Sequence, residues 1–251
     1  MNLELQGKRV LVTGGSKGIG YAIAKRLVEE GAIVTITARH AEELHQAAEQ
    51  LGARWLEMDV TKESDVDEQF QRYIKANGGI DILVNNAGGS QGGLTLDTQL
   101  SEFQEAMALN FYSAVQLSQL AAMQMKQQKQ GAILQISSIF GRESGGKPTY
   151  NASKSALISF TKSFADEMIP HGVRVNSIAP GAILHPSGNW QRRLEKNPQG
   201  IQTFVEQNIP AGRFGTAEEI ADVAAFIVSA RASWVVGATL NVDGGQSNMN
   251  F

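Results

Sequence analysis

Residues 13–20 read Thr13-Gly14-Gly15-Ser16-Lys17-Gly18-Ile19-Gly20 and join an apolar run at residues 8–13 to a helical pattern at residues 19–30. Backbone N–H groups at the start of a helix, together with the helix dipole, favour a bound phosphate. Glycines are needed in such a loop because a Cβ would block the close approach of a pyrophosphate or the tight turn. The stretch therefore predicts the first strand, loop and helix of a dinucleotide-binding sheet.

The same loop also contains Gly14-Gly15-Ser16-Lys17-Gly18, which matches the G-x-S-x-G pattern of the nucleophile elbow in α/β-hydrolases. An elbow requires earlier strands and an oxyanion loop, and too few residues precede Ser16 to supply them. The spacing G-x-x-x-G-x-G after a first strand indicates dinucleotide binding instead.

Beyond the loop, short apolar runs alternate with helical patterns along the chain, which is typical of βαβ units. The units predict one α/β domain over residues 1–251, a Rossmann-type doubly wound parallel sheet of about seven strands with helices on both faces. Residues 181–212 look irregular and are expected to form a substrate loop or lid. The predicted strands are 8–13, 32–38, 54–59, 80–85, 132–137, 173–178 and 238–242, and the helices are 19–30, 41–51, 63–76, 101–130, 150–168 and 217–229.

Composition removes several classes of function. The formal net charge is −3 and no run of Lys or Arg occurs, so nucleic acid is not an expected partner. The chain has 26 glycines and no cysteine, which excludes disulfides, thiolate metal sites and thiol nucleophiles. No metal is expected, because metal-binding spacing is missing from His40, His45, His171 and His185.

The N-terminal residues Met1-Asn2-Leu3-Glu4 lack the positive charge of a signal peptide, so a cytoplasmic location is expected. Residues 106–125 carry no charge, but their amide and hydroxyl side chains would be costly in hydrocarbon. That segment is therefore expected to be a buried or interface helix, with no membrane contact.

Tyr150 and Lys154 are four residues apart, a spacing that places both side chains on one face of a helix. An ammonium beside a phenol stabilises the phenolate, so Lys154 is expected to lower the pKa of Tyr150 toward neutrality. Tyr150 could then exchange a proton with the oxygen of a ketone or alcohol. Ser138 follows the fifth strand and could hydrogen-bond the same oxygen, although Ser137 competes for this role.

Five segments in order resemble the short-chain dehydrogenase/reductase family, and together they span nearly the whole chain. The glycine loop is the first, and the others are Asn85-Asn86-Ala87-Gly88, Ser138 with Tyr150-Asn151-Ala152-Ser153-Lys154, Pro180-Gly181 and Asn241-Val242-Asp243-Gly244-Gly245. The resemblance implies hydride transfer between a nicotinamide cofactor and a carbonyl or alcohol, with Ser138, Tyr150 and Lys154 at the reacting oxygen. It also implies that Asn110 positions a water behind the lysine as part of a proton relay.

The glycine loop and the resemblance together assign a set of cofactor contacts, in which Asp59 accepts from the adenine amino group. The expected contacts are Gly14, Ser16, Lys17, Gly18, Ile19, Gly20, Arg39, Asp59, Val60, Asn86, Ala87, Gly88, Tyr150, Lys154, Pro180, Gly181 and Ile183.

The second strand ends at Thr37-Ala38-Arg39, where an NAD-dependent enzyme would offer an acid to the ribose hydroxyls. Arg39 can instead bind a 2′-phosphate with its guanidinium fork, and Lys17 adds a second positive charge. Glu42 and Glu43 weaken this field. The sequence predicts NADP(H), with NADPH preferred over NADH by roughly tenfold or more in kcat/KM.

The substrate is expected to lie against loops carrying Phe140, Glu143, Ser144, His185 and Trp190. His185 stands where the family has a threonine that contacts the nicotinamide amide, and it could add a group that titrates near neutrality. These residues suggest a partly apolar, partly polar small molecule but do not identify it. The expected activity is that of a general NADPH-dependent carbonyl reductase or alcohol dehydrogenase.

Two alternatives remain open. The chain also resembles bacterial 3-oxoacyl-[acyl-carrier-protein] reductases, in which arginines beside the active site bind the carrier, and those places hold Lys129 and His171 here. A non-catalytic NADPH sensor or scaffold is the other alternative. The helices at 101–130 and 150–168 carry apolar surplus at Leu157, Ile158, Phe160, Phe164 and Met168. The resemblance implies that these helices are buried between subunits, so a homotetramer is expected.

Overall fold

A computed structural model describes residues 1–250 and places seven strands in one parallel sheet of order β3-β2-β1-β4-β5-β6-β9. This confirms the doubly wound architecture predicted from the alternating pattern. The order in which the strands follow one another reverses between β1 and β4, which creates the crevice where such sheets bind ligands. The strands are β1 (Arg9–Thr13), β2 (Ile33–Ala38), β3 (Arg54–Glu57), β4 (Ile82–Asn85), β5 (Gly131–Ile136), β6 (Val173–Pro180) and β9 (Thr239–Val242).

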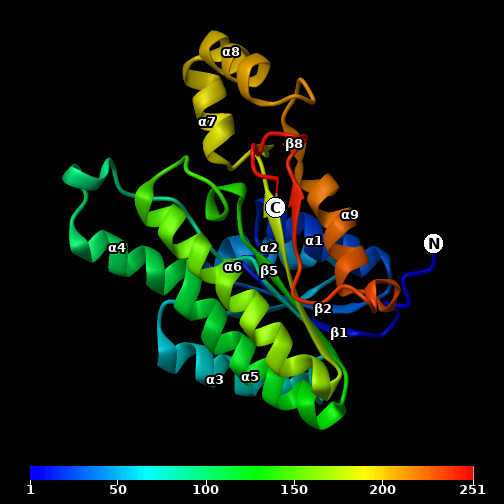
Figure 1. Cartoon of the computed structure of the whole chain (residues 1–251). Helices are drawn as coiled ribbons and strands as arrows, with labels where there is room; N and C mark the ends of the chain where they lie inside the picture. Colours follow the sequence, from blue (N-terminus) through cyan, green and yellow to red (C-terminus); the bar gives the residue numbers. More distant parts are fainter. Residues whose placement is uncertain (251) are drawn as a thin grey trace.

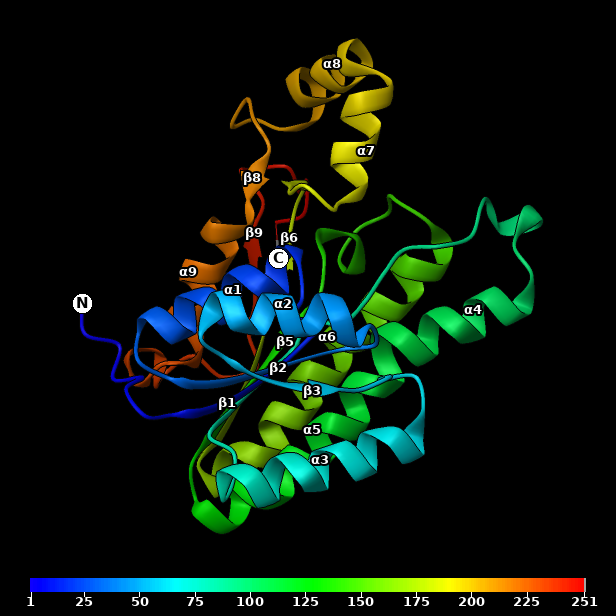
Figure 2. The ribbon, with the colours of Figure 1, turned by 180° about the vertical axis from the view of Figure 1, so that it is seen from behind.

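Helices cover both faces of the sheet (Figures 1 and 2). The side chains of β1 show how the two layers divide. Val10 and Val12 belong to one core, and Leu11 between them belongs to the other, as the period of two in a strand requires. The first core packs on α1 (Gly18–Glu29), α2 (Ala41–Leu51) and α9 (Ala217–Val228), and the second on α3 (Glu63–Asn77), α5 (Ser113–Gln128) and α6 (Pro148–Met168).

The single helix predicted at residues 101–130 is instead two α-helices joined by a π-helical turn. α4 (Leu100–Met107) leads into the turn at Ala108–Tyr112, and α5 follows at once. Asn110 lies inside the turn, and its amide Nδ2 donates to the carbonyl of Ala106 at 2.9 Å. A π turn inserts one residue into the helix, often at a functional site, and hydrophobic periodicity does not reveal it.

Residues 181–212 are not irregular, contrary to the expectation. They contain β7 (Ile183–Leu184), α7 (Asn189–Lys196) and α8 (Pro198–Asn208), and the last two stand above the carboxyl ends of the sheet (Figure 1). The side chain of Asn197 accepts from the backbone N–H of Gly200 at 3.0 Å and caps α8. α7 was missed because it presents too few apolar side chains to show a period of 3.6.

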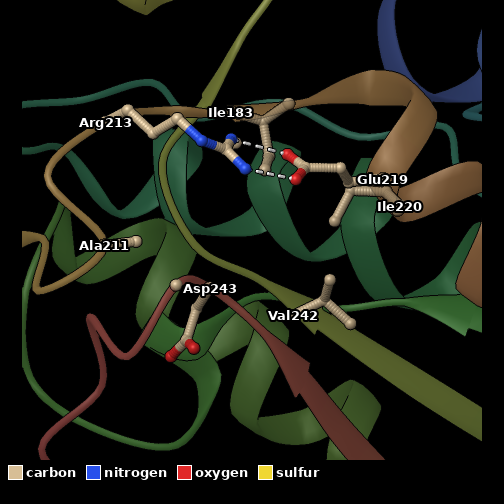
Figure 3. A pocket seen from close by; sticks show the side chains of 9 residues that line it. Ile183, Ala211, Arg213, Glu219, Ile220, Val242 and Asp243 are labelled. Carbon is tan, nitrogen blue, oxygen red and sulfur yellow. Dashed lines mark hydrogen bonds and ion pairs between the residues drawn. The ribbon is translucent and has the colours of Figure 1, made fainter.

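β7 pairs with β8 (Gly215–Thr216), so the segment begins and ends on a short two-stranded stem. At the base of this stem Arg213 forms a forked ion pair with Glu219, with nitrogen–oxygen distances of 2.9 and 2.6 Å (Figure 3). The small hollow beside the pair has a volume of about 100 Å³, below the size of a typical ligand pocket. The ion pair therefore anchors the chain where it returns to the sheet, and α7 and α8 project beyond this anchor.

Most of the large apolar side chains of α6 are buried in the core of the protomer itself. They therefore do not form the subunit contact that the sequence predicted for the homotetramer. Leu157, Phe164 and Met168 are buried. Large apolar side chains are exposed elsewhere, at Leu94, Leu96, Leu100, Met123 and Trp234. The homotetramer remains a prediction that now rests on these positions.

Among residues 1–250, no helix has both the length and the apolar character that crossing a bilayer requires.

Candidate active site

An open cavity of about 1040 Å³ lies beyond the carboxyl ends of β1, β4, β5 and β6. Its volume exceeds that of most small-molecule pockets and can accommodate a dinucleotide together with a substrate. The wall includes most of the expected cofactor contacts: Gly14, Ser16, Lys17, Gly18, Ile19, Arg39, Val60, Asn86, Ala87, Gly88, Tyr150, Lys154, Pro180, Gly181 and Ile183.

The glycine loop forms a backbone cradle at the start of α1. Gly14 and Gly18 have φ angles of +64° and +59°, which residues with a Cβ rarely adopt. Asn86 of the neighbouring strand end donates to the carbonyls of Thr13 and Gly14 at 3.0 and 3.1 Å, which fixes the loop. Gly14 and Gly18 both line the cavity, and backbone N–H groups at the start of α1 fit a pyrophosphate.

Gly20 does not line the cavity, although it was an expected cofactor contact. A Cβ at this position would lie 2.3 Å from both the side chain of Asn86 and the carbonyl oxygen of Gly14. Gly20 therefore lets α1 pack closely against the loop, and its role is structural.

The adenosine end of the cavity carries positive charge. Arg39 and Lys17 both lie on the wall, and the ammonium of Lys17 is 3.5 Å from the carboxylate of Glu43. Both partners of this pair are more than half exposed, so water and a competing phosphate can displace it. Arg39 and Lys17 are the two cations that this end of the cavity offers to an anionic group.

Asp59 is a second exception among the expected cofactor contacts. Its carboxylate accepts from the backbone N–H and the hydroxyl of Thr61, at 3.1 and 2.7 Å, and lies outside the cavity. Burial alone would raise the pKa of Asp59, but the Thr61 hydrogen bonds and the charge of Lys62 outweigh it and lower the pKa. Asp59 thus acts as a local turn cap, and Val60 is the part of this segment that lines the cavity.

Ser138, Tyr150 and Lys154 converge on the floor of the cavity from two elements. Ser138 follows β5, and its hydroxyl accepts from the backbone N–H of Phe140 at 3.2 Å. Tyr150 and Lys154 lie on one face of α6, and the ammonium is 5.6 Å from the centre of the tyrosine ring. Ser137 donates to the carbonyl of Ile178 at 2.8 Å, and this internal bond leaves Ser138 as the available hydroxyl.

The expected pKa of Tyr150 near neutrality is wrong for this arrangement. Burial raises the pKa of Tyr150, and the hydrogen bond with Ser138 offsets only part of that effect. The ammonium of Lys154 instead donates to the carbonyl of Ile136 at 2.8 Å, and burial lowers the pKa of Lys154 to about 8. Tyr150 is therefore protonated at pH 7, as a proton donor to a carbonyl must be.

The pKa of Lys154 predicts how reduction depends on pH. Below about pH 8 the ammonium is charged and stabilises the negative charge that develops on Tyr150, and above that pH the charge is lost. We expect kcat/KM for ketone reduction to be level between pH 6.5 and 7.5, and to fall by up to about tenfold per unit above pH 8. Initial rates with saturating NADPH between pH 6 and 10 measure this, and a level profile up to pH 10 contradicts it.

Asn110 lies behind the cavity floor instead of on its wall. Its side chain is buried, accepts from the N–H of Gly89 at 2.9 Å and donates to the carbonyl of Gly89 at 3.0 Å. A Cβ on Gly88 would lie 2.7 Å from Asn110 Oδ1 and 3.3 Å from Lys154 Nζ, so both side chains meet at this glycine. The position fits a residue that acts through Lys154, and the water relay remains a prediction.

Two of the expected substrate residues do not reach the cavity. Glu143 accepts from the hydroxyl of Ser247 at 3.2 Å and from the N–H of Asn248 at 2.9 Å, so its carboxylate binds the C-terminal segment. Ser144 is exposed and outside the wall. Phe140 and Trp190 do line the cavity, as expected.

His185 lies over the phosphate-binding loop, on the cofactor side of the cavity. A Cβ on Gly18 would come within 2.8 Å of its ring, and its Nδ1 is 3.2 Å from the hydroxyl of Ser187. Burial, helped by the charge of Lys17, lowers the pKa of His185. The ring is therefore neutral at pH 7 and does not supply the expected group that titrates near neutrality.

The residues expected to bind the carrier lie at the opposite end of the sheet from the cavity of the same protomer. Lys129 ends α5 just before β5, and His171 precedes β6, whereas the cavity is at the carboxyl ends of these strands. Strands that run parallel place their starts at one edge, so the two side chains lie far from Tyr150 of the same protomer.

Sequence reasoning missed several cationic and aromatic residues of the cavity wall. They come from the start of α6 and from the lid, and they are Lys147, Arg192, Arg193, Lys196 and Phe204. The spacing of the cations within residues 192–196 places Arg192 and Lys196 on one side of a helix, and it would have indicated a cationic surface if the segment had been predicted to be helical.

A backbone cradle for a dinucleotide beside Ser138, Tyr150 and Lys154 defines an oxidoreductase that acts on CH–OH or C=O groups. Comparison with known proteins identifies the group: residues 14–247 match a family model described as "Enoyl-(Acyl carrier protein) reductase". The chain belongs to the short-chain dehydrogenase/reductase family.

Curated relatives match over nearly the full length of the chain. The 3-oxoacyl-[acyl-carrier-protein] reductase FabG of Aquifex aeolicus is 36% identical over 252 residues, which cover 98% of this chain and 99% of that protein. The protein of the same name in Escherichia coli strain K12 is 35% identical over 246 residues, covering 97% of this chain and 98% of its own.

A solved structure is also similar throughout. L-sorbose reductase from Gluconobacter frateurii, complexed with NADPH and L-sorbose, has a TM-score of 0.93 and 34% identity, and covers 99% of this chain and 100% of its own.

Proposed function

We propose that this protein uses NADPH to reduce a ketone to a secondary alcohol. The observation that carries the proposal is the convergence of Ser138, Tyr150 and Lys154 on the floor of a cavity that also contains the dinucleotide cradle. Bound NADPH would supply the hydride that adds to the carbonyl carbon. Ser138 hydrogen-bonds the carbonyl oxygen, Tyr150 gives it a proton, and Lys154 stabilises the resulting phenolate.

The cofactor proposal rests on Arg39 and Lys17 at the adenosine end. A guanidinium can hold a phosphate with two parallel hydrogen bonds, and no carboxylate stands at the end of β2 to repel it. The similar L-sorbose reductase, whose solved structure is complexed with NADPH, supports the same choice.

For the substrate we place a 3-oxoacyl thioester on an acyl carrier first. The curated relatives named above support this class over the general carbonyl reductase that the sequence favoured. A polyhydroxylated ketone is the second candidate, since the solved structure with a TM-score of 0.93 is a reductase bound to L-sorbose.

Direct competition of substrates tests the order. We expect kcat/KM with acetoacetyl carrier protein to exceed that with L-sorbose or ethyl acetoacetate by about 100-fold or more, because remote binding energy is used at the reacting centre. A higher value with L-sorbose reverses the order. Tight NADPH binding without turnover of any ketone would favour the sensor or scaffold.

We also propose that the enzyme works in the cytoplasm as a homotetramer. The exposed apolar side chains of Leu94, Leu96, Leu100 and Trp234 support self-association. Light scattering at micromolar concentration should give about four times the 27.0 kDa chain mass. A monomer under these conditions contradicts the assembly.

A further inference from the structure

The cavity wall carries far more positive than negative charge, although the whole chain has a formal net charge of −3. Among the described residues on the wall, Glu43 is the one carboxylate, and it pairs with Lys17. The cationic wall residues are Lys17, Arg39, Lys147, Lys154, Arg192, Arg193 and Lys196. Such a cleft concentrates anions.

The proposed cofactor accounts for only part of this charge. Its 2′-phosphate would take Arg39 and Lys17, and its pyrophosphate would take the backbone N–H groups of the glycine loop. Lys154 is committed to the carbonyl of Ile136 and to the reacting tyrosine. The cations of α7 therefore lack a partner in the cofactor.

Arg192, Arg193 and Lys196 are exposed cations on α7, and the first two contact other side chains of the same helix. Arg192 donates to Oδ1 of Asn189 at 2.6 Å, and Lys196 follows one turn later on the same side of the helix. The guanidinium of Arg193 lies 5.0 Å from the ring of Trp190, which is a cation–π distance. Among residues 1–250 no carboxylate pairs with these three side chains.

The wall beside these cations is firm and apolar. Trp190 stacks on Phe204 with a centroid distance of 4.6 Å, and both rings line the cavity. The aromatic pair holds α7 against α8, and the Trp190 ring lies beside the Arg193 guanidinium. A charge-assisted hydrogen bond is stronger beside such a surface than in bulk water.

We propose that α7 binds an anionic group, a phosphate, on the same substrate molecule whose ketone meets Tyr150. This inference rests on the proposed function and adds the substrate class to it. Two sources share the chemistry: a 3-oxoacyl thioester on a phosphopantetheine arm, and a phosphorylated ketose. Both place a ketone and a phosphate on one flexible molecule, and they differ in what joins the two.

Matched substrate pairs that differ by one phosphate test this directly. One arm compares acetoacetyl-phosphopantetheine with acetoacetyl-pantetheine, and the other compares fructose 6-phosphate with fructose. We expect kcat/KM to be about 10- to 100-fold higher for the phosphorylated member of the pair that resembles the true substrate. Equal values within both pairs overturn the proposal.

Variants then locate the effect on α7. The triple variant Arg192→Gln, Arg193→Gln, Lys196→Gln should reduce the ratio between phosphorylated and unphosphorylated substrates to below about threefold. Lys75→Gln removes one exposed charge from α3, outside the cavity wall, and should preserve the ratio. Circular dichroism checks that both variants fold.

Two further measurements distinguish a substrate phosphate on α7 from a contact with the cofactor. If the triple variant raises the Kd of NADPH tenfold and leaves the substrate ratio intact, the cations serve the cofactor and the proposal is wrong. If no ketone is turned over, the proposed function fails, and calorimetry with the enzyme–NADP⁺ complex still decides. Phosphopantetheine or fructose 6-phosphate should then bind at least about tenfold more tightly than its unphosphorylated partner.

Discussion

Replacing Tyr150 by phenylalanine should lower kcat for ketone reduction by about 10²- to 10⁴-fold. The phenol is the group on the cavity floor that is protonated at neutral pH beside Ser138, because burial raises its pKa. Phenylalanine keeps the ring over Lys154 and removes only the proton donor. Steady-state rates with acetoacetyl carrier protein or L-sorbose give the ratio, and fluorescence titration gives the Kd of NADPH.

The matched control is Tyr112→Phe. Tyr112 is 58% exposed, and it lies on the π-helical turn outside the cavity wall. We expect its kcat to stay within about twofold of the parent chain, because an exposed hydroxyl makes little net contribution. If Tyr150→Phe retains more than a tenth of the parent kcat, Tyr150 is not the proton donor.

Replacing Arg39 by aspartate should reverse the cofactor preference. The change removes a two-pronged phosphate ligand and places a carboxylate where it repels a 2′-phosphate but can accept from the ribose hydroxyls of NADH. We expect the ratio of kcat/KM for NADPH to that for NADH to fall by about 10²- to 10³-fold, equivalent to about 3–4 kcal/mol. Initial rates with each cofactor at fixed ketone measure the ratio.

Arg72→Asp provides the comparison for the same change of charge. Arg72 pairs with Glu68 on α3, at 2.8 Å and with both side chains exposed, away from the cavity wall. Its variant should keep the parent ratio between the two cofactors, since exposed charges farther apart than a Debye length are largely screened. An unchanged ratio in Arg39→Asp would assign the 2′-phosphate to another cation, and Lys17→Gln would be the next variant to measure.

Much of the fold could be predicted because short-range signals determine it. Buried parallel strands appear as apolar runs, and Gly52 and Gly78 end the helices before β3 and β4 with left-handed backbone. The π turn around Asn110 and the helices of the lid were not predictable in the same way. The π turn inserts a residue into the helical repeat, and the lid helices are only eight and eleven residues long with few buried side chains.

The parts of the candidate site that depend on the backbone could be predicted from the sequence. The contacts of side chains that have several possible hydrogen-bond partners were harder to predict. The glycine loop, Ser138, Tyr150 and Lys154 line the cavity as expected. Asp59 turns instead to the nearby hydroxyl of Thr61. Glu143 accepts a hydrogen bond from the hydroxyl of Ser247, which is 104 residues away in the chain. A local sequence pattern cannot predict such a contact.

The hydrogen bonds of Glu143 with Ser247 and Asn248 determine which end of the chain is better suited to carry a tag. Residue 143 lies in the loop that follows Ser138, so the segment at Ser247 and Asn248 is fastened to a loop beside the cavity. An affinity tag fused to the C-terminus of the chain would be joined to the segment that contacts this loop. The exposed Met1, which lies away from α7 and α8 in Figure 1, offers an attachment point that leaves the cavity undisturbed.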